Sequence, residues 1–342
     1  MKTVFQCEKD KFCQGVLRRH WSDVPKWDDI TTLTGAHILE VTGGIDVVAW
    51  GSPCQNLSRA GNGLGLEGDE SKLFFEGIRI INELRQVSNG QFPRWSIWEN
   101  VAGALFSNRG SDFGQVLKSL ADAGACFSEW AVLDAQYFGV PQHRRRVFVA
   151  SCFDSRVSSK CPEPLFPVAI SVIGDSKKRN RERLGLTREP KEISDGYSQL
   201  GFRLRGFGYY IEDGSFSTIT TRESKQTTTD LVISPMADVK QFRAKDGKIW
   251  LGADVSPLWD LFGEKELINA NYVLKDVDFV VRTLTPIEYE RMMGWEEHHT
   301  EFMDNGKKVS EVQRIKMCAN GVVSYVAKWV GEVIGKAENT NA

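Results

Sequence analysis

The stretch IDVVAWGSPCQ, residues 45–55, indicates the fold class more clearly than any other part of the chain. Its first six residues are mainly apolar, which is typical of a buried strand in a parallel sheet. Open α/β sheets bind ligands beyond the carboxyl ends of their strands, and Cys54 falls at such an end. Pro53 fixes one backbone dihedral next to the thiol. Taken alone, the stretch fits a nucleophilic cysteine and an inert loop cysteine equally well.

Strand-like and helix-like segments alternate around this stretch. Short apolar runs predict strands, and apolar residues at helical spacing predict helices between them. The expected strands are 3–7, 45–50, 95–98 and 147–150, and the expected helices are 10–21, 71–87 and 113–123. This order predicts an α/β fold with a mostly parallel sheet between layers of helices.

The composition and spacing pattern of the sequence change twice along the chain, which predicts three parts. Closely spaced prolines and a charged run at 177–183 follow the first part, and helical spacing returns near Val281. We therefore expect a catalytic domain over 1–154 and a smaller, loop-rich domain over 155–277. Residues 278–342 should form a C-terminal segment that packs back on the first domain.

Composition sets limits on partners and location. The 342 residues carry a formal net charge of −2, so the bulk charge gives no reason to expect nucleic acid. The seven cysteines form no Cys-x-x-Cys pair, which argues against a zinc site and a disulfide framework. No apolar stretch approaches the length of a membrane helix, and no secretion signal is evident. We expect a cytoplasmic protein with no metal and no membrane partner.

Four further blocks follow the Pro-Cys-Gln sequence along the chain. They read WENVAG at 98–103, QHRRRVFV at 142–149, RTLTPIE at 282–288 and CANGVV at 318–323. Together they resemble the cytosine-C5-specific DNA methyltransferases, whose Pro-Cys-Gln, Glu-Asn-Val, Gln-x-Arg-x-Arg and Asn-x-Val blocks occur in this order. Each block alone is weak, but the ordered set is specific, and it covers about 3–152 and 281–335. The resemblance implies a Rossmann-like, S-adenosylmethionine-dependent methyltransferase fold with a target-recognition domain at 155–277.

The resemblance assigns catalytic roles to four residues. Cytosine C5 is a poor nucleophile, so the reaction needs a transient covalent bond at C6, which the Cys54 thiolate would form. Glu99 would meet the N3 and N4 edge of the base, and Arg146 would hold its O2. Arg144 would order the loop and the nearby DNA backbone, whereas Arg145 reads as a solvated arginine. A base in a duplex is out of reach, so the target cytosine must be flipped out.

The resemblance also implies double-stranded DNA as partner and S-adenosylmethionine as methyl donor. The expected cofactor-binding residues are Glu8, Asp29, Ile30, Pro53, Leu73, Asn320 and Val322. A carboxylate at a strand end suits the ribose hydroxyls, which favours Glu8, whereas Leu73 and Val322 fit equally well as ordinary core residues. Gln142 and Thr218 are the expected DNA-binding residues, although a Thr-rich strand explains Thr218 nearly as well.

The sequence departs from the family pattern at its start. Only seven residues precede Glu8, so the first strand, its glycine-rich turn and the following helix are expected to be missing. A misplaced start, a separate chain that supplies the missing unit, and a decayed copy all remain open. We expect weak or no cofactor binding by the isolated chain. Ala319 stands where the family has glycine, which is a milder change.

Two other readings compete with the enzyme. An inactive or split relative would bind DNA but need a missing N-terminal piece for cofactor binding. A nucleotide-binding thiol enzyme unrelated to DNA would explain Cys54 but not the blocks at 282–288 and 318–323. The ordered blocks favour a cytosine-C5 DNA methyltransferase, and the sequence leaves open a role in restriction-modification, phage defence or regulation.

Overall fold

The computed structural model describes most of the first and last parts of the chain. The described residues are 1–53, 72–158, 164–166, 200–205, 209–211, 216–219, 231–235 and 279–339. Cys54, the expected nucleophile, lies outside them, as does the charged run at 177–183.

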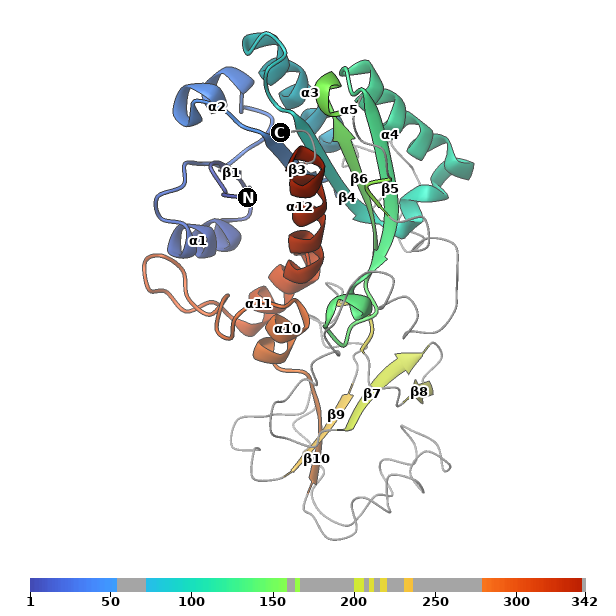
Figure 1. Cartoon of the computed structure of the whole chain (residues 1–342). Helices are drawn as coiled ribbons and strands as arrows, with labels where there is room; N and C mark the ends of the chain where they lie inside the picture. Colours follow the sequence, from blue (N-terminus) through green and yellow to red (C-terminus); the bar gives the residue numbers. More distant parts are fainter. Residues whose placement is uncertain are drawn as a thin grey trace.

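A four-stranded sheet forms the centre of the first part (Figure 1). Its order is β3 (Val47–Gly51), β4 (Trp95–Val101), β6 (Arg145–Cys152) and β5 (Phe127–Asp134). The pair β3 and β4 is parallel, and β6 runs antiparallel to both of its neighbours. All strands of this sheet except β6 therefore point the same way, which confirms the expected mostly parallel α/β fold.

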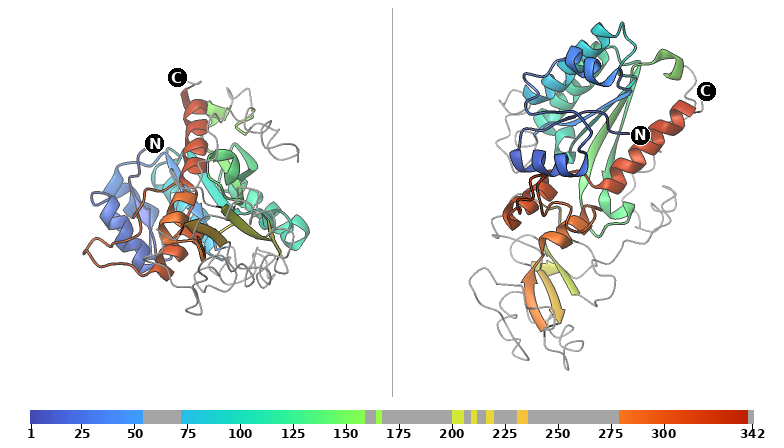
Figure 2. Two further views of the ribbon diagram at one scale, coloured as in Figure 1. Left: turned by 90° about the horizontal axis from the view of Figure 1, so that it is seen from below. Right: turned by 90° about the vertical axis from the view of Figure 1, so that its left-hand side faces the viewer.

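Alternation along β4 and β6 separates two apolar cores. Trp95 packs in the core that α12 (Ser324–Asn339) covers, and Trp98 packs in the core under α3 (Lys72–Val87) and α4 (Ser111–Asp122). Side chains of a strand point alternately to opposite faces, so each strand feeds both cores. The layers are visible in Figure 2, where α12 lies on one side of the sheet and α3 and α4 on the other.

The N-terminal residues form a separate small unit. Its strands β1 (Gln6–Cys7) and β2 (Lys26–Trp27) are parallel and flank α1 (Lys11–His20), and α2 (Gly35–Thr42) follows them. The expected strand at 3–7 is shortened to two residues, because only these pair with another described strand. Arg79 of α3 ties this unit to the first domain by donating to the carbonyl oxygens of Leu33 and Ile30, at 2.9 and 2.7 Å.

Short helices and turns connect the elements of the first domain. The 3-10 helices η2 (Ala102–Leu105) and η3 (Ser107–Gly110) follow β4, η4 (Ala135–Phe138) follows β5, and α5 (Ser155–Ser158) follows β6. The sequence analysis missed β5, whose apolar residues are interrupted by Ser128 and Glu129.

The second sheet contains the described strands of the middle part. Its order is β10 (Phe279–Thr283), β9 (Leu231–Pro235), β7 (Leu200–Arg205) and β8 (Tyr209–Ile211), with antiparallel pairs throughout. Strand β10, which follows the expected boundary at 277, pairs with β9 of this sheet.

The C-terminal helices contact the central sheet. The C-terminal segment consists of α10 (Pro286–Met292), α11 (Glu311–Asn320) and α12, with a break at Gly321. Inside it, Arg314 pairs with Glu290 at 2.9 Å, and both side chains are buried. Glu338 accepts a hydrogen bond from Trp95 Nε1 at 2.5 Å and pairs with Arg94, which fixes the end of α12 on the sheet.

Candidate active site

The carboxyl ends of β3 and β4 lie side by side, because Gly51 pairs with Glu99 in the parallel register. The next residue, Ser52, is buried and held by the neighbouring strand. Trp98 Nε1 donates to Ser52 Oγ at 3.1 Å, and Asn100 Nδ2 donates to Ser52 O at 3.1 Å and to Ser52 Oγ at 3.0 Å. These contacts fix the first residue of the loop that continues through Pro53 to Cys54.

Glu99 and Arg146 form the charged part of the site. Arg146 Nε lies 3.3 Å from Glu99 Oε1, and the two side chains are 14% and 18% exposed. Burial raises the pKa of Glu99, against the opposing charges of Arg146 and then Arg144. A carboxyl group with a raised pKa holds a proton more readily, so Glu99 is suited to donate a hydrogen bond to a base.

Arg144, only two residues away, lies in a different environment. Its side chain is buried and donates from one terminal nitrogen to Ala319 O at 2.8 Å and Gly321 O at 2.7 Å. Its other terminal nitrogen donates to Ile219 O at 3.3 Å. These contacts agree with an ordering role, but the buried side chain is not available for the expected contact with the DNA backbone. Arg144 therefore joins β6, the segment 216–219 and the turn between α11 and α12.

Gln142 and Thr218 also make internal contacts. Gln142 is fully buried, donates to Met292 O at 3.1 Å and accepts a hydrogen bond from Ile219 N at 3.4 Å. The Thr218 hydroxyl donates to His143 O. The expected DNA contact of Gln142 is not available to its side chain here, because the protein interior already surrounds it. Both residues dock the segment 216–219 on the first domain.

A polar network that was not expected from the sequence holds the connection between β5 and β6. The Asp134 carboxylate accepts hydrogen bonds from Arg144 N at 3.1 Å and from Gln136 Nε2 at 2.7 Å. Gln136 Nε2 also lies 2.8 Å from His143 Nδ1. Ser52 and Asn100 were given no role either, although Ser52 lies in the stretch 45–55 and Asn100 lies in the Glu-Asn-Val block.

The expected cofactor residues on the N-terminal unit lie at adjacent strand ends. Glu8 N donates to Trp27 O at 3.0 Å, which brings the ends of β1 and β2 together. The Asp29 carboxylate accepts from Thr31 N at 3.0 Å, from Thr31 Oγ1 at 2.7 Å and from Lys9 Nζ at 3.0 Å. These hydrogen bonds, those from Thr31 foremost, lower the pKa of Asp29 to about 2.

Of the remaining expected cofactor residues, Ile30 follows Asp29 in the same unit, and the others lie on three other segments. Ile30 packs against the core of α2 and α3, and Leu73 is half-buried in the first turn of α3. Pro53 is half-buried beyond β3, and Asn320 is exposed at the end of α11. Val322 and Glu99 line the same cavity.

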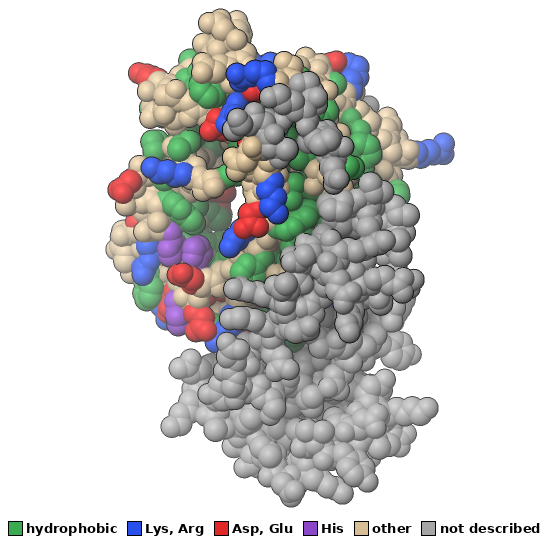
Figure 3. Space-filling view, in the orientation of Figure 1, with side chains coloured by type: hydrophobic (Ala, Val, Ile, Leu, Met, Phe, Trp, Pro, Cys, Tyr) green, Lys and Arg blue, Asp and Glu red, His purple; other side chains and the backbone are tan. Residues whose placement is uncertain are grey.

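The described residues were also compared with the requirements of a metal site and of a membrane helix. No three histidine, cysteine or acidic side chains among the described residues are grouped so as to hold a metal ion. Within the same part of the chain, no helix has the length and apolar character needed to cross a membrane. Figure 3 shows acidic and basic side chains interspersed over the described part of one face.

Comparison with known proteins shows the family. The family model described as C-5 cytosine-specific DNA methylase matches residues 1–336. The "Type II methyltransferase M.Sau3AI" of Staphylococcus aureus is 29% identical over 75% of this chain and 71% of that protein. The "DNA N-6-adenine-methyltransferase" of Escherichia phage P1 is 24% identical over 98% of this chain. The match spans only 58% of the phage protein's length.

Solved structures show the same fold at lower sequence identity. The S. pombe Dnmt2 methyltransferase superposes with a TM-score of 0.56 and 16% identity, over 99% of this chain and 92% of that chain. A DNA modification methyltransferase encoded within an E. coli prophage gives a TM-score of 0.53 and 16% identity, over 99% and 93%. The family match over almost the whole sequence, together with this fold, shows that the chain belongs to the C-5 cytosine-specific DNA methylases.

Proposed function

We propose that this protein is a DNA (cytosine-5-)-methyltransferase that transfers a methyl group from S-adenosylmethionine to a flipped cytosine in duplex DNA. One observation carries the proposal. Trp98 and Asn100 fix Ser52, so the loop that carries Cys54 begins beside the buried pair of Glu99 and Arg146. A nucleophile, an acid and an oxygen-binding guanidinium are the groups that methylation at C5 requires.

Cys54 would act as the nucleophile. Its thiolate would add to C6 of cytosine and load the electron pair of the C5–C6 double bond onto C5, which would accept the methyl group that S-adenosylmethionine supplies when bound, with S-adenosylhomocysteine as the leaving group. Loss of the C5 proton and expulsion of the thiolate restore the double bond and release the enzyme. The cysteine is therefore regenerated, and the net change is one methyl group in place of one proton.

Glu99 and Arg146 would hold the base during this addition. As the thiolate adds, negative charge develops on N3 and O2, and these atoms need a proton donor and a cation. The raised pKa of Glu99 favours its protonated form, which can donate to N3. Arg146 carries a fixed positive charge that suits O2. Retention of both groups in contact does not favour an inactive, DNA-binding relative.

The residues at the ends of β1 and β2 fit an adenosyl group. Carboxylates at adjacent ends of parallel strands suit ribose hydroxyls and an adenine amino group, which Glu8 and Asp29 would bind. Ile30 and Leu73 would contact the adenine, and Pro53, Asn320 and Val322 would close the site. S-adenosylmethionine supplies an activated methyl group when bound.

The second domain would read the DNA sequence. The segment 216–219 docks on Gln142 and His143, so DNA bound by this domain would be placed next to Arg146. Thr218, which remains partly exposed, is the better candidate for a DNA contact than the buried Gln142. Relatives named as Type II methyltransferases favour a role in restriction-modification.

Covalent trapping tests the proposed function. Duplex DNA that contains 5-fluorocytosine should form a stable adduct in the presence of S-adenosylmethionine, because fluorine cannot leave as the proton does. Cys54→Ser should abolish the adduct, whereas Cys126→Ser, at an exposed cysteine far along the chain, should not. An adduct that survives Cys54→Ser, or N6-methyladenine as the product on ordinary DNA, would refute the mechanism.

A further inference from the structure

A pocket on the surface of the first domain lies where β5 and β6 meet the turn after β4. Its volume is about 360 Å³. The strands contribute Trp130, Val132 and Arg145 to its lining, and η2 with the residue after it contributes Leu105 and Phe106. We call this space, between these five side chains, the β5 pocket. None of the five takes part in the proposed methyl transfer, so the pocket is available for a separate task.

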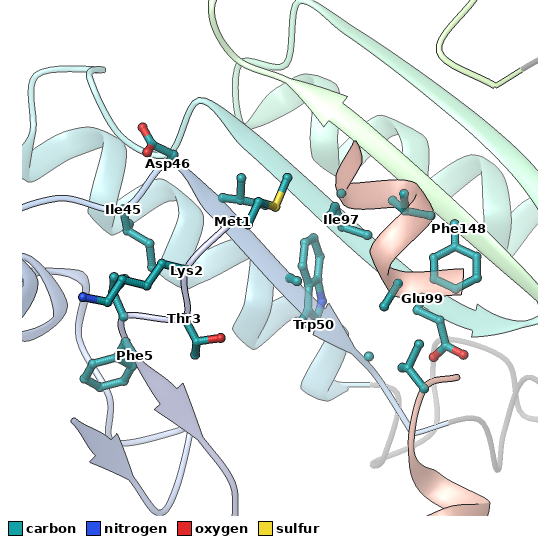
Figure 4. A pocket seen from close by; sticks show the side chains of 18 of the residues that line it. Met1, Lys2, Thr3, Phe5, Ile45, Asp46, Trp50, Ile97, Glu99 and Phe148 are labelled. Atoms are coloured by element: carbon teal, nitrogen blue, oxygen red, sulfur yellow. The ribbon is translucent and has the colours of Figure 1, made fainter. Parts of the chain in front are cut away.

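The β5 pocket and the pair of Glu99 and Arg146 lie on opposite faces of the central sheet, near the same end of β6. Glu99 and Phe148 pair across β4 and β6 on the face that α12 covers, and Figure 4 shows the two side chains next to each other. Arg146 contacts Glu99 on this face. Arg145 precedes Arg146 in β6, so its side chain points to the other face. Consecutive Cα atoms are about 3.8 Å apart, so a DNA strand bound at the pair lies within reach of Arg145.

Two aromatic side chains of the pocket are presented to solvent from fixed positions. Phe106 is 71% exposed and Trp130 is 48% exposed. The Trp130 ring lies edge-on to Phe113 of α4, with the ring centroids 5.5 Å apart. Phe106 N donates to Gly103 O at 3.0 Å, and the buried Ala104 anchors the same turn. Exposed apolar groups that cluster in this way mark interaction sites.

The charge of the pocket is positive. Among the described residues that line it, Arg145 is the only charged one. Arg145 is exposed, and within the described part of the chain its guanidinium forms no ion pair. Asp134 is opposite Arg145 in the strand register, but its carboxylate is buried and accepts hydrogen bonds from Gln136 and from Arg144 N. The pocket therefore combines exposed aromatic rings with a cation that can bind an anion.

This combination suits a nucleotide. Aromatic faces stack on bases of any sequence, and a guanidinium binds phosphate oxygens. A volume of 360 Å³ is near the lower end of the range for small-ligand pockets, roughly 300–1,000 Å³, and suits a single nucleotide. A base within a duplex is covered on both faces by its neighbours, so only an unpaired base can reach these rings. An apolar protein segment would cover the rings but leave Arg145 without an anion, which favours DNA as the occupant.

We propose that the β5 pocket binds one unpaired nucleotide of a DNA strand, with its base on Phe106 and Trp130 and its phosphate on Arg145. The proposal rests on the proposed function only in taking DNA as the ligand, and it needs neither the cofactor nor the nucleophile. Flipping of a cytosine opens the strand around it. A nucleotide held in the β5 pocket would keep that strand open beside Arg146.

Binding of a single strand by the full chain tests the proposal. A fluorescein-labelled strand of twelve thymidines is titrated without cofactor, and its anisotropy is measured at several salt concentrations. Phe106→Ala removes an exposed stacking surface and should weaken binding by about fivefold or more, whereas Phe106→Tyr keeps an aromatic ring and should stay within about twofold of the parent. Arg145→Met should also weaken binding, and it should reduce the slope of log K against log salt by about 0.7.

Photochemical crosslinking locates the base. When one thymine is replaced by 5-iodouracil, irradiation should attach the strand to the peptide that contains Trp130, and Phe106→Ala should reduce this product. Trp21→Ala is the matched control, because Trp21 is an aromatic residue of the N-terminal unit that is 37% exposed, and it should change neither measurement. Cys54→Ser should bind the strand as the parent does, so a failure of covalent trapping would leave this result intact.

Several results would overturn the proposal. They are the absence of measurable binding of the single strand, binding by Phe106→Ala within about twofold of the parent, and crosslinks confined to other peptides. Sedimentation adds one more. If Phe106→Ala dissociates a dimer and leaves the affinity for DNA unchanged, the pocket is a contact between two copies of the chain and not a nucleotide site.

Discussion

The strand ends at the catalytic site and those of the N-terminal unit differ in how their polar groups are held. Ser52 and Asn100 bond to each other in the interior, and Glu99 and Arg146 pair largely out of solvent. Glu8 and Asp29 are held by their own turns and by the exposed Lys9. The ends of β3 and β4, the rigid half of the proposed site, are thus held by buried contacts, whereas the ends of β1 and β2, its exposed half, depend on contacts that water weakens.

The largest effect, on the rate of methyl transfer, should follow the replacement of Glu99 in the rigid half. Glu99→Gln keeps the shape of the side chain but cannot supply a proton to N3, so methyl transfer should fall by about 10²–10⁴-fold. Rates measured at saturating DNA and cofactor separate this loss from weaker binding. A kcat within a factor of three of the parent would show that Glu99 is not the acid.

The same substitution should change the dependence of stability on pH. The raised pKa of Glu99 means that the folded state holds its proton more tightly than the unfolded state. Stability should therefore fall as pH rises from the ordinary glutamate range through the raised value, and Glu99→Gln should remove that fall. Chemical unfolding of both proteins across this range measures the difference.

A smaller effect, a loss of stability, is expected when Arg144, which joins three segments, is replaced. Arg144→Met leaves the carbonyls of Ile219, Ala319 and Gly321 without this donor, which should cost on the order of 3 kcal/mol of unfolding free energy. Arg145→Met is the matched control, because Arg145 is exposed, and its change should stay within about 0.5 kcal/mol. Urea unfolding gives both values, and equal losses would contradict the joining role.

Asn100, which holds Ser52, should contribute somewhat less to the free energy of unfolding than Arg144 does. Asn100→Ala removes both hydrogen bonds to Ser52, which should cost about 1–3 kcal/mol and loosen the loop that leads to Cys54. The yield of trapped DNA adduct should fall more than DNA affinity does. An unchanged rate of adduct formation would show that the loop is held by other contacts.

The smallest effect is expected on the exposed half. The lowered pKa of Asp29, about 2, stabilises the fold above the ordinary aspartate range, and this contribution disappears as pH falls toward 2. Asp29→Asn should therefore make acid unfolding less steep, which is opposite in sign to the Glu99 effect. Asp28→Asn, at the exposed neighbouring residue, should leave the acid limb unchanged. Acid titration of stability at constant ionic strength checks both.

Much of the fold followed from local sequence pattern. The mostly parallel sheet between helices followed from periodicity, and the family followed from the ordered blocks. The burial of Gln142 could not be predicted, because it depends on Met292, 150 positions away, and on Ile219. Strand β5 was missed since polar residues interrupt its apolar run, and pairing with β6 stabilises it nonetheless.

The contact between Arg144 and Ile219 bears on how such enzymes diversify. Arg144 contacts the segment 216–219 through the backbone carbonyl of Ile219, and any amino acid at that position supplies such a carbonyl equally well. The side chains of the second domain are therefore free to vary without loss of this joint. Grafts of recognition regions between relatives should succeed most often when their junctions leave the backbone of 216–219 in place, and new DNA targets can arise by exchange of whole modules.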